Sequence, residues 1–171
     1  SSDVCSSDLG GSVEDAIIPA AAIEVLHTYS LIHDDLPCMD DDDLRRGKPT
    51  LHKLYNEGQA VLVGDLLLTL AFEMLSSNSS LAPEKTVRLI ETLAKKSGGE
   101  GMVLGQSLDL AGEGTKLSLD QLIEIHERKT GDLISTALAF GGIVSGASFE
   151  VCDTLSQIGQ EVGLSFQIID D

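Results

Sequence analysis

The sequence predicts an all-α protein, and three observations carry this prediction. Apolar residues recur at helical spacing over long stretches, and no stretch alternates apolar and polar residues as a half-buried strand does. Aromatic residues make up only 4% of the chain, with no tryptophan, whereas leucine and alanine are abundant. With 171 residues and a hydrophobic fraction of 42%, the chain is long enough for one domain with a buried core.

The helices can be placed in order from the apolar pattern and from cap and breaker residues. The first is expected over 12–36, with Ser12 as its N-cap and Pro37 ending it. After a loop over 44–52, further helices are expected over 55–75, 83–96, 101–110, 119–140 and 149–171. The 55–75 helix is apolar nearly all round, so we expect it to be deeply packed.

The two ends of the chain differ from the rest. Residues 1–9, SSDVCSSDL, are polar and lack a helical period, so they read as a non-native or disordered leader, and the domain is assigned to 10–171. The other end stops within a pattern, at Asp170-Asp171, so we expect a partial domain.

Composition limits the partners and the location. The net charge of −17 argues against nucleic acid, which requires a basic surface. No run of about 18 apolar residues appears, so no stable membrane insertion is expected. The chain shows no signal peptide, and its three cysteines have neither zinc nor disulfide spacing; a reducing, cytoplasmic location is therefore expected.

One acidic stretch dominates the sequence. It places six aspartates within ten residues, directly before two arginines: Asp34, Asp35, Asp40, Asp41, Asp42, Asp43, Arg45 and Arg46. The first two stand at the carboxyl end of an apolar helix, where the helix dipole is already negative, so a cation must offset them. The calcium-loop pattern is absent, whereas few carboxylates beside arginines suit Mg²⁺ shared with phosphates. The simpler alternative is a solvated acidic turn.

The spacing within this stretch makes a geometric demand. Asp34 and Asp40 are six residues apart, which on a straight helix places them about 120° apart around the axis. The Pro37-Cys38 pair must therefore bulge the chain if both carboxylates are to reach one metal cluster.

These residues also carry a family resemblance. DDLPCMD followed by DDDLRRG resembles the first aspartate-rich motif, DDxxxxD, of the trans-isoprenyl diphosphate synthases, the farnesyl and geranylgeranyl diphosphate synthase group. FQIIDD at 166–171 resembles the start of the second motif, FQxxDDxxD. The resemblance covers roughly 10–171. It implies a bundle of long, mostly antiparallel helices around a central cavity, and a homodimer, for which the 55–75 helix is the candidate interface.

The resemblance implies a reaction and a set of residues. An allylic diphosphate ionises with the help of Mg²⁺, for which Mn²⁺ is a possible substitute, and the double bond of isopentenyl diphosphate attacks the cation head-to-tail. The implied metal ligands are Asp34, Asp35, Asp40, Asp170 and Asp171. Arg45 is expected on the allylic diphosphate, Arg46 and His27 on isopentenyl diphosphate, and Lys129, Thr130 and Gln167 act as catalytic residues that contact the allylic diphosphate. His33, His52 and Asp41 to Asp43 receive no role.

Product length is expected to depend on Tyr29 and Ser30. They precede Asp34 by one to one and a half turns, or roughly 6–8 Å along the helix, so Tyr29 can form the floor of a cavity for the growing tail. An aromatic residue at this position, with the two-residue insertion Pro37-Cys38, resembles bacterial-type farnesyl (fifteen-carbon) synthases. A geranylgeranyl (twenty-carbon) product stays open.

Other functions remain open at this point. A class I terpene cyclase would share the fold and the metal chemistry but bind one diphosphate, a non-catalytic prenyl synthase subunit would have lost the aspartates, and a generic acidic protein would bind metal without diphosphate. The family's N-terminal helices and the segment after residue 171 have no counterpart here. The isolated fragment is therefore expected to be inactive or nearly so.

Overall fold

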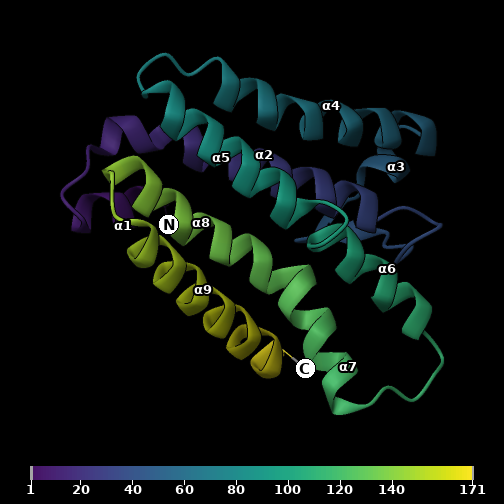
Figure 1. The fold of residues 1–171 in the computed structure, drawn as a ribbon. Coiled ribbons are helices and arrows are strands. Elements are labelled where there is room, and N and C mark those ends of the chain that lie inside the picture. Colours follow the sequence, from purple (N-terminus) through teal and green to yellow (C-terminus); the bar gives the residue numbers. More distant parts are fainter. Residues whose placement is uncertain (1, 171) are drawn as a thin grey trace.

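The computed structural model describes residues 2–170, with the side chains of residues 5–169, and this part of the chain is almost entirely helical (Figure 1). The helices are α1 (Ser2–Asp8), α2 (Val13–Asp34), α3 (Leu51–Leu54), α4 (Glu57–Ser76), α5 (Pro83–Ser97), α6 (Met102–Gly112), α7 (Leu119–His126), α8 (Asp132–Ser145) and α9 (Phe149–Asp170). A π-helix, η1 (Glu127–Gly131), joins α7 to α8. The prediction of an all-α fold is confirmed.

The long helices lie side by side in a bundle (Figure 1). Helix α2 packs against α4 on one side and α8 on the other, and α8 in turn packs against α5 and α9. The core between them contains leucines and one phenylalanine that solvent barely reaches: Leu26, Leu75, Leu89, Leu93 and Phe140. Burial of such side chains stabilises the bundle by about 1.5–3 kcal/mol each before entropy is counted.

Local chemistry explains where the main helices begin and end. The Ser12 hydroxyl accepts a hydrogen bond from the Asp15 backbone N–H, as predicted for the N-cap of α2. Ser118 and Gln121 form a capping box at α7. Gly146 ends α8 with a φ of +81°, a left-handed conformation that glycine adopts without a steric penalty.

Several sequence predictions need correction. Residues 2–8 were expected to be a non-native or disordered leader, but they form a helix that packs against α8. Their non-native origin remains a prediction. The loop over 44–52 contains a two-stranded antiparallel hairpin, β1 (Leu44–Arg45) and β2 (Lys48–Pro49), followed by α3. The single helix expected over 119–140 is divided by η1.

Helix α4 is less buried than its composition predicts. One stripe of small and apolar residues faces the bundle, Ala60, Gly64, Ala71 and Leu75, but Leu62 and Leu66 on the other side are each more than 60% exposed. Helices α2 and α4 are also both long and apolar enough to cross a membrane by length and composition, a property that core helices of soluble proteins share. The absence of a run of about 18 apolar residues was therefore too narrow a criterion for judging which helices could cross a membrane.

Glycines bring α9 unusually close to its neighbours. A Cβ atom at Gly159 would lie 2.4 Å from the Ser135 Cα of α8, and one at Gly163 would lie 2.5 Å from the Gly131 Cα of η1. The backbones of these helices therefore touch where any larger residue would hold them apart.

Candidate active site

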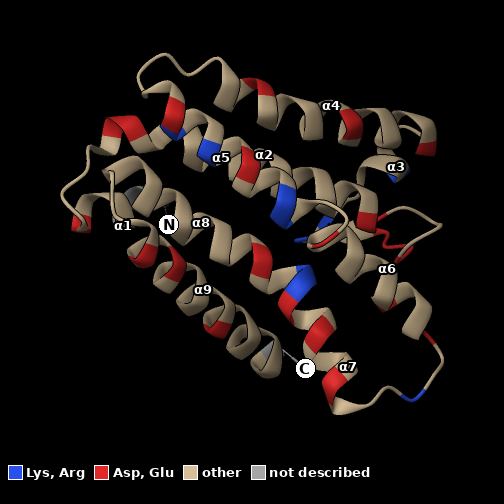
Figure 2. Ribbon diagram, viewed as in Figure 1, with Lys and Arg blue, Asp and Glu red and all other residues tan. Residues whose placement is uncertain are grey.

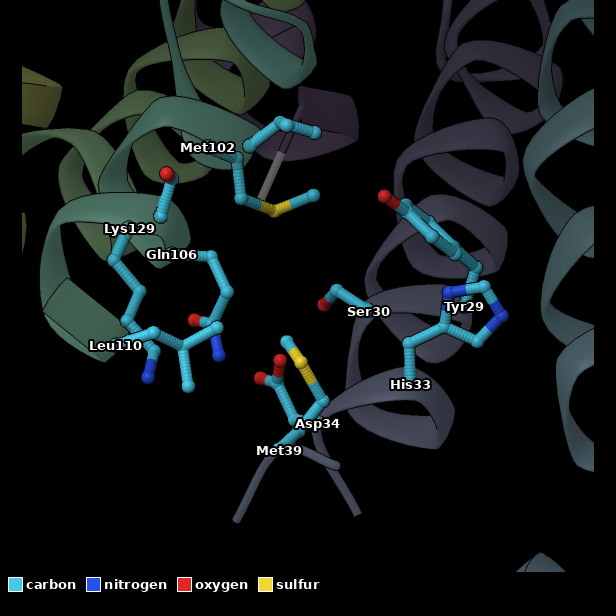
Figure 3. Close-up of a pocket in the computed structure, with 11 residues that line it drawn as sticks. Tyr29, Ser30, His33, Asp34, Met39, Met102, Gln106, Leu110 and Lys129 are labelled. Carbon is cyan, nitrogen blue, oxygen red and sulfur yellow. The ribbon is translucent and has the colours of Figure 1, made fainter. Parts of the chain in front are cut away.

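A cavity of about 290 Å³ opens between α2, α6 and η1 (Figure 3). Asp34, Lys129 and the Gln106 amide lie toward one end, and Tyr29 and Met102 lie toward the other (Figure 3). The remaining lining residues are Ser30, His33, Met39, Val103, Ser107 and Leu110. The cavity is therefore charged at one end and mainly apolar toward the other.

Asp34 is the acidic group of this cavity. Burial raises the pKa of Asp34 from its ordinary 3.8 to about 6, against the opposing effect of Lys129, and the nearby Asp40 carboxylate adds to the increase. A carboxylate with this pKa holds its negative charge at a cost, and a cation bound beside it would lower that cost.

The chain after Asp34 turns back over the end of α2. The Asp40 backbone N–H donates to the Asp34 carbonyl oxygen at 2.9 Å, and the Met39 N–H donates to the Leu36 carbonyl oxygen at 2.9 Å. Helix α2 thus ends before Pro37-Cys38 and the chain turns there, while a metal cluster shared by Asp34 and Asp40 remains a prediction. Asp40 is exposed to solvent just beyond the end of the helix that carries Asp34.

Lys129 is the basic group of the cavity, and it lies in the π-helix. Its ammonium donates to the Asp109 carboxylate of α6 at 2.6 Å. Burial lowers the pKa of Lys129, but the hydrogen bond and charge of Asp109, together with the charges of Asp34 and Asp40, raise it overall. Lys129 is therefore held as a cation. Gly105 lets α6 approach the η1 backbone, since a Cβ there would lie 2.5 Å from the Lys129 nitrogen.

Asp35 has a different partner from Asp34. Its side chain is buried and accepts hydrogen bonds from the Arg45 guanidinium, at 2.8 Å from Nε and 2.5 Å from Nη2. Through these charge-assisted hydrogen bonds Arg45 ties the β1–β2 hairpin to the end of α2. The hydrogen bond to Asp35 raises the pKa of Arg45.

Arg46 stands at the tip of this hairpin. Arg46 and Gly47 have φ values of +53° and +76°, and Arg45 pairs with Lys48, which describes a two-residue type I′ turn. A left-handed conformation is uncommon for arginine, and such residues often occur at functional sites. Arg46 is exposed.

Thr50 and His52 close the base of the same hairpin. The buried Thr50 hydroxyl donates to the Asp42 carbonyl oxygen at 2.7 Å, its backbone N–H donates to the Asp43 carbonyl oxygen at 3.0 Å, and its oxygen lies 3.2 Å from His52 Nδ1. Lys53 pairs with the Asp43 carboxylate at 2.6 Å. These contacts fix the loop that carries the arginines.

The structure brings some of the predicted site residues together and leaves others apart. One cavity is lined by Tyr29, Ser30, Asp34 and Lys129. His27 on α2 is half-buried. Burial lowers the pKa of His27, the charge of Glu24 opposes this, and the charges of Arg46 and Arg45 lower the pKa further. Thr130 and Gln167, on η1 and α9, are not among the lining residues.

The metal roles of the aspartates remain predictions. Asp171 lies outside the described residues, and the side chain of Asp170 is not described. Among the side chains that are described, no three His, Cys, Asp or Glu residues gather closely enough to hold a metal ion.

Two polar residues of α6 were missed by the sequence analysis. Gln106 lines the cavity and Asp109 holds Lys129. The signal was present in GQSLDL, where polar residues three apart interrupt an otherwise apolar helix on one face.

Charge is distributed unevenly over the molecule (Figure 2). The sequence has 28 acidic and 11 basic residues, and acidic residues are found on most of the helices. Lys129 lines the charged end of the cavity, and Arg45 pairs with Asp35, the residue next to Asp34. An anionic ligand therefore meets its cations there, in a protein that is otherwise strongly acidic.

The structure is thus a helical bundle with a cavity that is charged at one end and mainly apolar toward the other. The chain belongs to the polyprenyl synthetase family, which it matches over residues 3–171.

Known proteins similar to this chain are named as farnesyl or geranylgeranyl diphosphate synthases. It is 48% identical over 164 residues to farnesyl diphosphate synthase of Bacillus subtilis (strain 168), covering 95% of this chain and 55% of the relative. It is 46% identical over 172 residues to the chloroplastic geranylgeranyl pyrophosphate synthase 7 of Arabidopsis thaliana, covering 98% and 50%.

A solved structure agrees with them. The geranyltransferase of Helicobacter pylori, complexed with magnesium and isoprenyl diphosphate, superimposes with a TM-score of 0.88 at 48% identity, covering 92% of this chain and 52% of that one. The chain thus spans about half the length of the relatives it matches.

Proposed function

We propose that this chain is the allylic-substrate part of a prenyltransferase that condenses isopentenyl diphosphate head-to-tail with an allylic diphosphate, with farnesyl diphosphate as the product. The observation that carries the proposal is the cavity with Asp34 and Lys129 at one end and Tyr29 toward the other. A diphosphate fits the charged end and a prenyl tail fits the apolar end.

Mg²⁺ fits the residues at the charged end. Asp34 is a carboxylate whose charge is costly without a cation, and Asp40 returns to the end of the same helix. Mg²⁺ is commonly bound by one or two carboxylates plus substrate phosphates, so a ready-made cluster of three acids is not required. Asp35, Asp170 and Asp171 complete the proposed ligand set, and Mn²⁺ is a substitute. When bound, the metal neutralises charge that develops on the leaving diphosphate.

The chain's own residues act on the same charge. Lys129, fixed by Asp109, and Arg45, fixed by Asp35, are pre-organised cations that stabilise the diphosphate as the allylic C–O bond breaks and its electron pair leaves with oxygen. The isopentenyl double bond then supplies the electrons of the new C–C bond, and a proton is lost. Arg46 and His27 are assigned to isopentenyl diphosphate, and Thr130 and Gln167 to the allylic diphosphate.

Product length follows from the apolar end of the cavity. Tyr29 is buried and lies more than one helical turn before Asp34, so its ring limits how far the tail can extend. This supports a fifteen-carbon product. A twenty-carbon product is the alternative, which the similarity to a geranylgeranyl pyrophosphate synthase favours.

We also propose that the protein acts as a homodimer in the cytoplasm. The exposed apolar side of α4, with Val61, Leu62 and Leu66, offers a surface for a second copy.

The proposal is tested in a chimaera in which this chain replaces the matching part of the Bacillus subtilis relative. We expect it to convert labelled isopentenyl diphosphate and dimethylallyl diphosphate to farnesyl diphosphate in the presence of Mg²⁺, and Asp34→Asn to abolish this conversion. A terpene cyclase would consume an allylic diphosphate without isopentenyl diphosphate, and a non-catalytic subunit would consume neither. Either result would refute the proposed reaction.

A further inference from the structure

Two rings on α2, those of Tyr29 and His33, contact each other edge to face beside the cavity. Tyr29 and His33 lie four residues apart on α2, so their side chains share one face of the helix. Their ring centroids are 5.2 Å apart and the ring planes meet at 80°, an edge-to-face contact. Figure 3 shows the two rings together on the α2 side of the cavity, which both residues line.

Helix α4, which does not line the cavity, holds the second ring. His33 Nε2 lies 3.1 Å from the Val61 carbonyl oxygen, and because a carbonyl oxygen only accepts, Nε2 carries the hydrogen and donates. The His33 ring also fills the space beside Gly64. A Cβ atom at Gly64 would lie 2.0 Å from His33 Nε2 and 2.3 Å from its Cδ2. Position 64 therefore admits no side chain while His33 stays where it is.

These contacts connect α4 to the cavity through one side chain. An aromatic floor limits a growing tail only if its ring is held in one rotamer, since rotation about χ1 would open the space behind it. The contact with His33 restrains the Tyr29 ring, and α4 restrains His33.

We infer that Gly64 and His33 are positioning residues that hold the Tyr29 ring across the apolar end of the cavity and thereby limit the length of the prenyl chain it accepts. The inference rests on the proposed function. Neither residue touches the reacting atoms, so their substitution should change product length more than the rate of ionisation. A shift of α4 would reach the cavity by the same route.

The first experiment uses this chain itself, labelled with 3-fluorotyrosine. It contains only two tyrosines, Tyr29 at 9% exposure and Tyr55 at 70%, so the second is an internal reference for fluorine NMR. Gly64→Ala should move or broaden the Tyr29 signal. Gly58→Ala, on the same helix, should leave it unchanged, because a Cβ there meets only the Asn56 side-chain oxygen at 3.4 Å.

A double substitution isolates the pair. The three nearest atoms to a Cβ at Gly64 all belong to the His33 ring, so Gly64→Ala should have no further effect on Tyr29 in a His33→Ala background. An effect equally large in both backgrounds would overturn the inference, because it would show that Gly64 acts through other contacts.

The second experiment measures products in the chimaera. His33→Ala should raise the ratio of twenty-carbon to fifteen-carbon product about two- to tenfold, the factor that corresponds to the energy of an aromatic pair. His33→Phe, which keeps a ring but loses the donor, and His33→Gln, which keeps a donor but loses the ring, separate the two contacts. Gly64→Ala should shift the products toward shorter chains, because the displaced ring presses on Tyr29.

The outcomes separate the inference from the proposed function. Product lengths like those of the unmodified chimaera in the Gly64 and all His33 variants would overturn the inference. If Gly64→Ala does not fold, the two conservative His33 variants decide the same question. An unmodified chimaera that does not consume isopentenyl diphosphate would overturn the proposed function, while an unchanged Tyr29 signal in folded Gly64→Ala would overturn the inference whatever the activity.

Discussion

The Lys129 ammonium lies 2.6 Å from the Asp109 carboxylate, across the interface between the π-helix and α6. This pair orients the lysine that lines the cavity, across from Asp34 at the same charged end. A cation held in this way costs little reorganisation when negative charge develops on a substrate.

Lys129→Gln should therefore lower kcat of the chimaera about 10²- to 10³-fold, the usual effect of removing one charge-stabilising donor. Asp109→Asn should cost less, about tenfold, since the lysine stays but loses its anchor. Steady-state kinetics checks both, with the exposed Lys116→Gln as the matched control. Equal decreases of kcat in Lys116→Gln and Lys129→Gln would show that only the overall charge of the protein matters.

Tyr29→Ala should lengthen the product, because it removes the ring that closes the apolar end of the cavity. It should also destabilise the protein by about 3–5 kcal/mol, the usual cost of deleting a buried aromatic side chain. Chromatography of the products from the chimaera checks the first effect and urea unfolding the second. The exposed Tyr55→Ala serves as control, and unchanged chain length in Tyr29→Ala would refute the role of this ring.

The pKa of Asp34 predicts a pH-dependent stability. Because the folded state raises this pKa from 3.8 to about 6, it binds the proton more tightly than the unfolded state, and the free energy of unfolding falls as pH rises through this window. In metal-free buffer, Asp34→Asn should be about 1–2 kcal/mol more stable than the wild type at pH 7.5. The difference should shrink toward pH 4. Urea unfolding with EDTA checks this, and a difference that is constant with pH would contradict it.

Thr50→Val should loosen the hairpin that carries Arg45 and Arg46. It keeps the shape of a buried side chain but leaves the Asp42 carbonyl oxygen without its donor, at a cost of about 1–3 kcal/mol. We expect KM for the diphosphates to rise and product length to stay unchanged. The control is Thr69→Val, whose hydroxyl bonds only within an exposed helical turn. A changed product length would place the effect in the cavity instead.

Gly163→Ala should push α9 away from η1, because the new Cβ would lie 2.5 Å from a backbone carbon that cannot move aside. Overpacking of this kind costs about 1–3 kcal/mol. Thermal unfolding measures it, with Gly99→Ala as control, since a Cβ at Gly99 meets nothing within 4 Å. Equal melting temperatures for the two variants would show that α9 adapts without cost.

Much of the fold follows from the sequence because local and global preferences agree. The cap at Ser12 and the apolar stripe of α2 define the helix that delivers Asp34, and this helix ends at Asp34, close to its expected end at residue 36. For this helix no tertiary information was needed.

The remaining features depend on contacts between distant segments. The packing of α4 could not be read from composition, because an apolar helix gives no sign of which of its faces has a neighbour. Asp109 becomes informative only beside Lys129, twenty residues away. The π-helix has no breaker residue that would reveal it, since Glu127 to Gly131 are ordinary in an α-helix apart from the glycine.

The π-helix has a consequence for how this family member can vary. It adds one residue to the helical ladder, so α7 and α8 are offset by about 100° from the phase that a continuous α-helix would give them. Substitutions between 127 and 131 leave that offset intact, but deleting a single residue would erase it. The deletion would rotate the helix that precedes it relative to α8 and α9. Lys129 could then no longer line the cavity while Gly131 stays in contact with α9. In this segment, the number of residues is therefore a requirement in addition to the identities of Lys129 and Gly131.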